Sequence, residues 1–189
     1  MLPEEKPYTW SDLEEIEDGK QYELLDGQLY LLASPSPFHG EISSNLERVL
    51  QTFFDKRKCR VYHAPQDVFL FNRPGDLKSS IRTAVQPDIF VLCSRGQRTE
   101  QGIFGAPTLV VEITSNSTKR NDRFLKYYLY QNAGVPEYWL VDPARQIVTV
   151  FTLEDAQYGA GEAFSLRDRV VSGVFPDLQM DTAEIFRSW

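Results

Sequence analysis

Two short runs of apolar residues constrain the fold of this chain most strongly. The stretches "IFVL" (89–92) and "LVV" (109–111) are rich in β-branched and aromatic residues, and neither alternates with polar residues. Continuous apolar runs of this length are typical of central strands that are covered on both faces. The sequence therefore predicts a sheet with helices on its two sides.

The N-terminal half adds two helices and a hairpin. Ser11, with Glu14 three residues later, has the pattern of a capping box and predicts a short helix. The pair Asp26-Gly27 divides two apolar-rich runs and supplies the positive φ angles that a two-residue type I′ hairpin turn needs. Residues 40–56 carry apolar side chains at helical spacing, which predicts an amphipathic helix with one core face.

The remaining elements continue the alternation of strands and helices. Residues 60–71 read as one or two strands interrupted at Pro65, and residues 117–134 have helical periodicity and end in a glycine. A hairpin is expected to turn at 142–146, and a weaker strand or two and a short helix, 181–186, close the chain. We therefore expect an α/β (α+β) fold with a central mixed sheet flanked by helices.

Composition restricts the classes of function and location. A formal net charge of −7 argues weakly against a protein that coats nucleic acid, although basic clusters occur at 56–60 and 119–126. Cys59 and Cys93 form no CxxC motif and no disulfide framework, so a reducing cytoplasm is expected. The charged N-terminus resembles no signal peptide, and no apolar run is long enough to span a membrane.

Carboxylates are the residues best placed for chemistry. The chain has no GxSxG, GxxxxGK or HExxH motif, and its two histidines make a multi-histidine zinc site improbable. Asp88 starts one expected central strand and Glu112 lies near the end of the other. If these strands are antiparallel neighbours, the two carboxylates converge at one edge of the sheet. Two like charges at close range require a proton or cation between them, and Mg²⁺ or Mn²⁺ suits oxygen ligands.

The same residues carry a resemblance to a known family. "QPDIFVL" followed by "LVVEIT" resembles the Pro-Asp and acidic-x-Lys motif of the PD-(D/E)XK nuclease superfamily. With "YELLDGQL", "SPSPFHGEI" and "RFLKYYLYQNAGVPEYWLVDP", the frame over residues 22–143 is similar to the Uma-two family of restriction-endonuclease-like proteins. The resemblance implies a restriction-endonuclease-like core at about 22–153 and a C-terminal extension, 154–189, within a single domain, 1–189.

The resemblance also implies a metal-dependent endonuclease that hydrolyses DNA. Asp88, Glu112 and the backbone carbonyl of Ile113 would hold one or two Mg²⁺ ions, which activate a water molecule. Thr114 stands where the superfamily triplet has lysine. In the Uma-two family this lysine has moved to the following helix, and Lys126 matches that position, to orient the water or stabilise charge on the phosphate.

Other residues of the expected site come from earlier and later segments. Glu23 is the first choice for the additional acidic residue that the superfamily often has, and Glu41 and Glu47 are its rivals. The expected DNA contacts are His39, Arg123 and Lys119, although His39 is about as well explained as a loop residue. The tyrosines of the 117–134 helix could stack on bases, but packing explains at least two of them better.

Plainer structural roles exist for both central carboxylates. Asp88 could accept backbone N–H bonds at a strand edge, and Glu112 could pair with Arg123 or Lys126. The acidic composition and Thr114 motivate a second hypothesis, a catalytically silent nuclease fold that binds nucleic acid or regulates. A homodimer is compatible with the resemblance, since superfamily members that cut both strands often pair two active sites.

Overall fold

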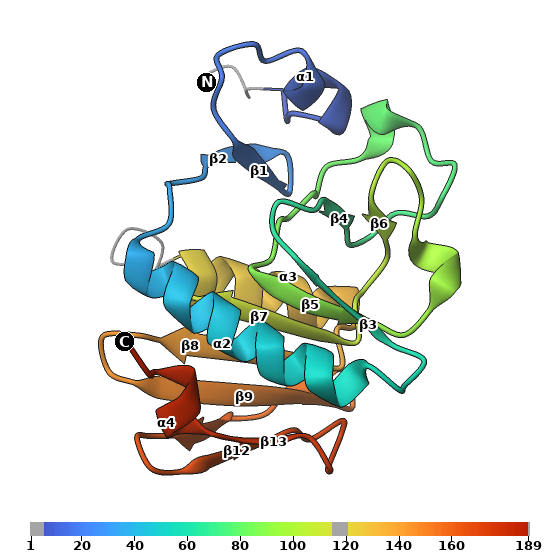
Figure 1. Ribbon diagram of the computed structural model, residues 1–189. Coiled ribbons are helices and arrows are strands. Elements are labelled where there is room, and N and C mark those ends of the chain that lie inside the picture. Colours follow the sequence, from blue (N-terminus) through green and yellow to red (C-terminus); the bar gives the residue numbers. More distant parts are fainter. Residues whose placement is uncertain (1–5, 115–120, 189) are drawn as a thin grey trace.

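The computed structural model describes residues 6–114 and 121–188, and a seven-stranded sheet forms its centre (Figure 1). The strand order is β10-β9-β8-β7-β5-β3, and β11 pairs with β9. The β7–β8 pair is parallel and the other pairs are antiparallel, so the sheet is mixed, as the sequence predicts. Its strands are β3 (Arg60–His63), β5 (Ile89–Leu92), β7 (Leu109–Ile113), β8 (Glu137–Asp142), β9 (Ile147–Glu154), β10 (Gln157–Tyr158) and β11 (Glu162–Phe164).

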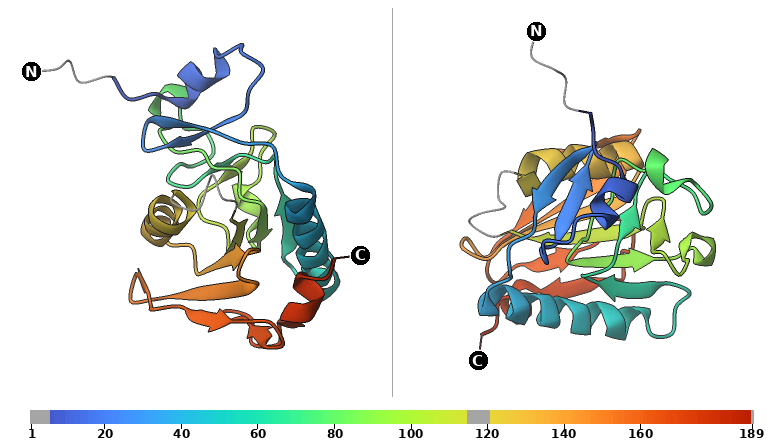
Figure 2. Two further views of the ribbon diagram at one scale, coloured as in Figure 1. Left: turned by 90° about the vertical axis from the view of Figure 1, so that its left-hand side faces the viewer. Right: turned by 90° about the horizontal axis from the view of Figure 1, so that it is seen from above.

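Two helices cover the faces of this sheet (Figure 2). Helix α2 (Pro37–Phe54) lies over one face, and α3 (Tyr127–Ala133), preceded by the π-helical turn η3 (Asn121–Lys126), lies over the other. Every residue of β5 and β7 is buried, which confirms that both are central strands. No helix in the described ranges is long and apolar enough to cross a membrane.

Helix α2 begins earlier than the apolar spacing predicts. Ser36 caps it by accepting a bond from the His39 N–H, and Pro37 occupies the first helical position. Proline is tolerated there because that N–H has no partner within the helix in any case. The expected apolar residues do face the core, with Ile42, Leu46 and Leu50 buried.

A smaller unit carries the N-terminal hairpin above the sheet (Figure 1). Strands β1 (Tyr22–Leu25) and β2 (Gln28–Leu31) turn at Asp26 and Gly27, with φ of 49° and 79°, as predicted. Helix α1 (Trp10–Glu14) is capped by Thr9 with Asp12, not by Ser11, because an equivalent capping pair lies two residues earlier. Strands β4 (Val68–Phe69) and β6 (Ile103–Phe104) form a separate parallel pair. The short helical turns η1 (Lys78–Ser80) and η2 (Arg95–Gln97) lie in the connections between strands.

The C-terminal extension contains more strands than expected and is fastened to the sheet by a buried glutamate. It forms the hairpin β12 (Arg169–Val171) and β13 (Gln179–Asp181), followed by α4 (Thr182–Ile185). Glu137 of β8 accepts bonds from Trp139 Nε1 (2.6 Å), Ser172 Oγ (3.0 Å) and the Val174 N–H (2.7 Å). Burial raises the pKa of Glu137, although these three donors partly oppose that effect.

The two cysteines form a disulfide, so the expectation of no disulfide is wrong. The reason lies in strand register. Arg60 of β3 faces Leu92 of β5, and Cys59 and Cys93 are the next residues outward on either side. Disulfides are rare in reducing compartments, so the cytoplasmic location stays a prediction from the sequence.

Candidate active site

Asp88 and Glu112 lie at adjoining ends of two antiparallel strands, as predicted. The ladder between β5 and β7 ends at the pair Ile89↔Val111. Beyond it, Asp88 Oδ2 accepts the backbone N–H of Ile113 at 2.7 Å. Asp88 therefore accepts a backbone N–H at a strand edge, as its plainer structural role requires. The same bond brings its carboxylate to Ile113, the residue next to Glu112.

Lys126 lies between two buried carboxylates. Its Nζ is 2.9 Å from Glu112 Oε1 and 3.0 Å from Glu23 Oε1. Glu23, Glu112 and Lys126 are 3%, 4% and 5% exposed, so water screens these ion pairs very little. The structure thus places Lys126, which belongs to the helical segment after β7, against Glu23 and Glu112. Glu112 therefore also forms the salt bridge with Lys126 that is the plainer explanation for this residue.

Tyr130 completes the contacts of Glu112 and was not predicted as a member of the site. Its hydroxyl donates to Glu112 Oε1 at 2.6 Å, and the whole residue is buried. Tyr130 follows Lys126 by one helical turn, so both side chains reach the same strand from one helix face. The i, i+4 spacing of a lysine and a tyrosine was the available sequence signal.

Glu23 is held in place by a second chain of hydrogen bonds. Its Oε1 accepts the Gln86 N–H at 2.8 Å, and Gln86 Nε2 donates to Asp67 Oδ1 at 2.9 Å. Burial is the main cause that raises the pKa of Asp67, and the charges of Glu14 and Glu23 raise it further. Sequence reasoning missed both residues: Asp67 belongs to no motif, and Gln86, although it begins "QPDIFVL", was given no role there.

The rival glutamates lie elsewhere. Glu47 Oε1 is 3.8 Å from His63 Nε2, and Glu41 lines a separate surface pocket with Asn45 and Arg187. Of the three candidates, the structure therefore brings Glu23 to Lys126 and Glu112.

The expected DNA contacts are only partly described. His39 lies in the first turn of α2, and its Nε2 is 3.2 Å from Asp88 Oδ1, so it faces the site. Lys119 lies outside the described residues. The backbone of Arg123 belongs to η3, but its side chain is also outside the described part.

The side chains at the site offer oxygen atoms, the type of ligand that a hard divalent cation such as Mg²⁺ prefers. Asp88, Glu112 and Glu23 supply carboxylate oxygens, and the hydroxyl of Thr114 is buried with no hydrogen-bond partner among the described residues. A buried polar atom of this kind implies a further polar group at the site. Within the described residues, however, no three His, Cys, Asp or Glu side chains are grouped closely enough to hold a metal. The cation that lies between Glu23 and Glu112 is the Lys126 ammonium.

We expect Tyr130→Phe to change the alkaline stability of the protein. Burial raises the pKa of Tyr130 well above its ordinary value, and the charges of Glu112 and Glu23 raise it further. Above about pH 10 the unfolded chain loses this proton and the folded chain keeps it. The contribution of Tyr130 to stability is therefore complete below that pH and is lost above it, by about 1.4 kcal/mol per pH unit.

Urea unfolding between neutral pH and pH 11 measures this effect. Tyr130→Phe should lose about 1 kcal/mol at neutral pH, because a buried hydrogen bond is removed, and should then show a shallower alkaline decline than the wild type. Tyr128→Phe is the matched control, since Tyr128 is exposed on the same helix. Equal alkaline slopes in wild type and Tyr130→Phe would contradict the assignment.

The Uma2 family model, described as "Putative restriction endonuclease", matches residues 10–183. The chain belongs to this family. A protein from Synechocystis, described as "Uncharacterized protein slr1290", is 27% identical to this chain over 82% of this chain and 77% of its own length.

A solved structure from Anabaena variabilis shows the same fold. It is described as a "putative nuclease belonging to DUF820" and superposes with a TM-score of 0.74 at 22% identity, over 95% of this chain and 98% of the other. The family and the nuclease-like fold that the sequence resemblance implied are thus confirmed for this Uma2 chain.

Proposed function

We propose that this Uma2 protein is a metal-dependent endonuclease that hydrolyses phosphodiester bonds of DNA. The observation that carries the proposal is the placement of Asp88 and Glu112 at adjoining strand ends, with the buried Lys126 against Glu112. These are the residue types that metal-assisted phosphodiester hydrolysis needs: oxygen ligands, and a cation to stabilise charge that develops on the phosphate.

Each residue has a proposed role. Asp88, Glu112 and the Ile113 carbonyl would hold Mg²⁺ or Mn²⁺, which when bound lowers the pKa of a water molecule and neutralises phosphate charge. Lys126 orients the attacking water or stabilises the developing negative charge, and Glu23 holds the ammonium from its other side. Tyr130 fixes one oxygen of Glu112, and His39 fixes one oxygen of Asp88.

A second candidate is a nuclease fold that binds nucleic acid without cutting it. The observation that favours it is that Lys126 pairs with both Glu23 and Glu112, as it would in a structural ion-pair cluster. A single domain and a homodimer with paired sites are further proposals, which follow from the resemblance.

A cleavage assay distinguishes the two candidates. Purified protein is incubated with supercoiled plasmid, single-stranded circles and a branched junction, each with Mg²⁺, Mn²⁺ or EDTA. We expect nicked or linear products from at least one substrate with metal and none with EDTA. Tight DNA binding that EDTA does not affect, with no products under either metal, would instead support the binding module.

A further inference from the structure

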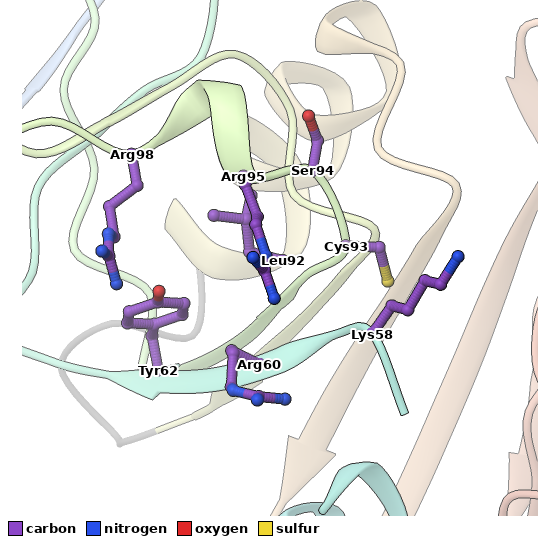
Figure 3. A pocket seen from close by; sticks show the side chains of 8 residues that line it. All are labelled: Lys58, Arg60, Tyr62, Leu92, Cys93, Ser94, Arg95 and Arg98. Carbon is purple, nitrogen blue, oxygen red and sulfur yellow. The ribbon is translucent and has the colours of Figure 1, made fainter. Parts of the chain in front are cut away.

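A basic pocket lies at the opposite end of β5 from Asp88 (Figure 3). Its volume is about 210 Å³. One wall comes from β3 and from Lys58, which precedes it. The other wall comes from the end of β5 and from the segment around η2. The lining residues are Lys58, Arg60, Tyr62, Leu92, Cys93, Ser94, Arg95 and Arg98.

Four of these side chains are cationic, and the lining contains no acidic residue. None of the four forms an ion pair with a carboxylate in the described part of the chain. In Figure 3, Arg95 and Arg98 extend from η2 toward β3, where Tyr62 and Arg60 lie. All four cations are exposed, so solvent weakens their mutual repulsion, and they gather positive charge locally in a chain with a net charge of −7. Such a local positive potential attracts anions.

The pocket is built on a fixed frame. The Cys59–Cys93 disulfide joins its two walls, because each cysteine lies between lining residues. The Tyr62 ring stacks on Phe90 with the ring centroids 5.3 Å apart, and the buried Leu92 lies in the wall formed by β5. The Nη1 of Arg60 donates to the Cys59 carbonyl at 2.9 Å, which restricts the guanidinium. The cations are therefore presented on an ordered surface.

The pocket opens on the same face of the sheet as Glu112. Tyr62 pairs with Phe90, Phe90 pairs with Val110, and Glu112 follows Val110 by two residues, so all four side chains point to the α3 side. Leu92, the lining residue at the end of β5, follows Asp88 by four residues, which is roughly 13 Å along the strand. For a duplex whose axis runs parallel to β5, that span corresponds to about four base-pair steps, since the rise along the axis is about 3.4 Å per step.

We propose that this pocket binds a phosphate group, and that its ligand is a backbone phosphate of the nucleic acid whose cleavage is proposed above. Guanidinium groups match phosphate oxygens bidentately, and the Tyr62 and Ser94 hydroxyls add neutral donors. The pocket would fix the nucleic acid a few nucleotides from the scissile bond and supply affinity that the acidic cluster cannot. The assignment of nucleic acid, and not a free phosphate compound, as the ligand rests on the proposed nuclease function.

Binding in EDTA tests the proposal without any need for cleavage. Fluorescence anisotropy of labelled single-stranded and duplex oligonucleotides is measured for the wild type and for the double variant Arg60→Ala/Arg95→Ala over a range of salt concentrations. Both arginines are exposed, so the fold should persist, which a thermal melt checks. The control is Arg73→Ala/Arg167→Ala, which removes the same charge at exposed positions outside the pocket lining.

We expect the pocket variant to bind roughly tenfold more weakly or worse, with a smaller salt dependence, and the control to bind within about twofold of wild type. Equal affinities for the wild type and both variants, or equal losses in both variants, would overturn the proposal. Competition with inorganic phosphate and a nucleoside monophosphate separates the sources. If these bind the wild type but not the pocket variant while oligonucleotide binding is unchanged, the phosphate site stands and nucleic acid as its ligand is excluded.

The two proposals fail in different ways. Pocket-dependent oligonucleotide binding with no cleavage under any metal would remove the nuclease function and keep the phosphate site. Metal-dependent cleavage with pocket variants that bind and cut like wild type would remove only the phosphate site.

Discussion

Asp88→Asn is expected to lower metal-dependent cleavage of DNA by roughly 10³-fold or more, while the protein stays folded. The asparagine keeps a side-chain oxygen that can accept the Ile113 N–H, a bond that Asp88 makes at 2.7 Å. It removes the negative charge that a divalent cation needs. The loss should therefore appear in cleavage of the best substrate and in calorimetric binding of Mn²⁺ or Mg²⁺, with little change in the melting temperature.

The matched control for this variant is Asp76→Asn. Asp76 also accepts a backbone N–H, that of Arg73 at 3.0 Å, but it is exposed on a loop, where its carboxylate bonds Asn72 and Arg73. Asp76→Asn should cut like wild type. If Asp88→Asn also cut at the wild-type rate, Asp88 would be a structural acceptor only and the proposed metal role would be wrong.

Lys126→Met should have the largest effect on stability, with a loss of about 3–5 kcal/mol in the free energy of unfolding. The variant leaves Glu23 and Glu112 buried without the ammonium that lies 3.0 Å and 2.9 Å from them. Two uncompensated carboxylates at that depth must be protonated or must draw in water, and both processes cost free energy. Thermal and urea unfolding at neutral pH should show a melting temperature lower by on the order of 10 °C.

Lys78→Met tests whether burial, and not distance, sets this loss. Lys78 Nζ lies only 2.6 Å from Glu14 Oε1, but the two side chains are 40% and 42% exposed. An exposed pair of this kind contributes about 1 kcal/mol at most, so the control should be nearly as stable as wild type. Equal losses in the two variants would contradict the importance of the buried cluster.

Two further measurements relate the stability loss to metal binding. Adding Glu23→Gln to Lys126→Met removes one of the uncompensated charges and should restore part of the stability. Ca²⁺ should also raise the melting temperature of Lys126→Met more than that of wild type, because a bound cation would replace the missing positive charge. A Ca²⁺ response identical in both proteins would speak against carboxylates that are able to hold a divalent ion.

Local patterns predicted the parts of the fold that local physics determines. The continuous apolar runs identified β5 and β7, and Asp26-Gly27 identified the β1–β2 turn, because each signal lies within the segment that it describes. The convergence of Asp88 and Glu112 needed one further assumption, the antiparallel pairing of their strands, which the structure has.

Features that depend on strand register or on packing between distant segments were missed. The Cys59–Cys93 bond follows from the Arg60↔Leu92 register, which no spacing in the sequence specifies. Gln86 is 63 residues from Glu23, so their hydrogen bond arises only when the hairpin docks. A tyrosine at this position of the sequence could equally pack in the core or belong to the site. Only the distance of 2.6 Å between its hydroxyl and Glu112 Oε1 shows that Tyr130 contacts the site.

The parallel β7–β8 pair has a consequence for a chain that is still leaving the ribosome. Glu23, Asp88 and Glu112 are made before Lys126, and β7 gains its parallel neighbour only when β8 has followed α3. Until Lys126 has been made the acidic side chains have no ammonium partner, and until β8 has been made β7 lacks its parallel neighbour. The cluster can therefore close only after the chain has been made as far as Lys126 and Tyr130, and the sheet beneath it is completed later still, when β8 pairs with β7.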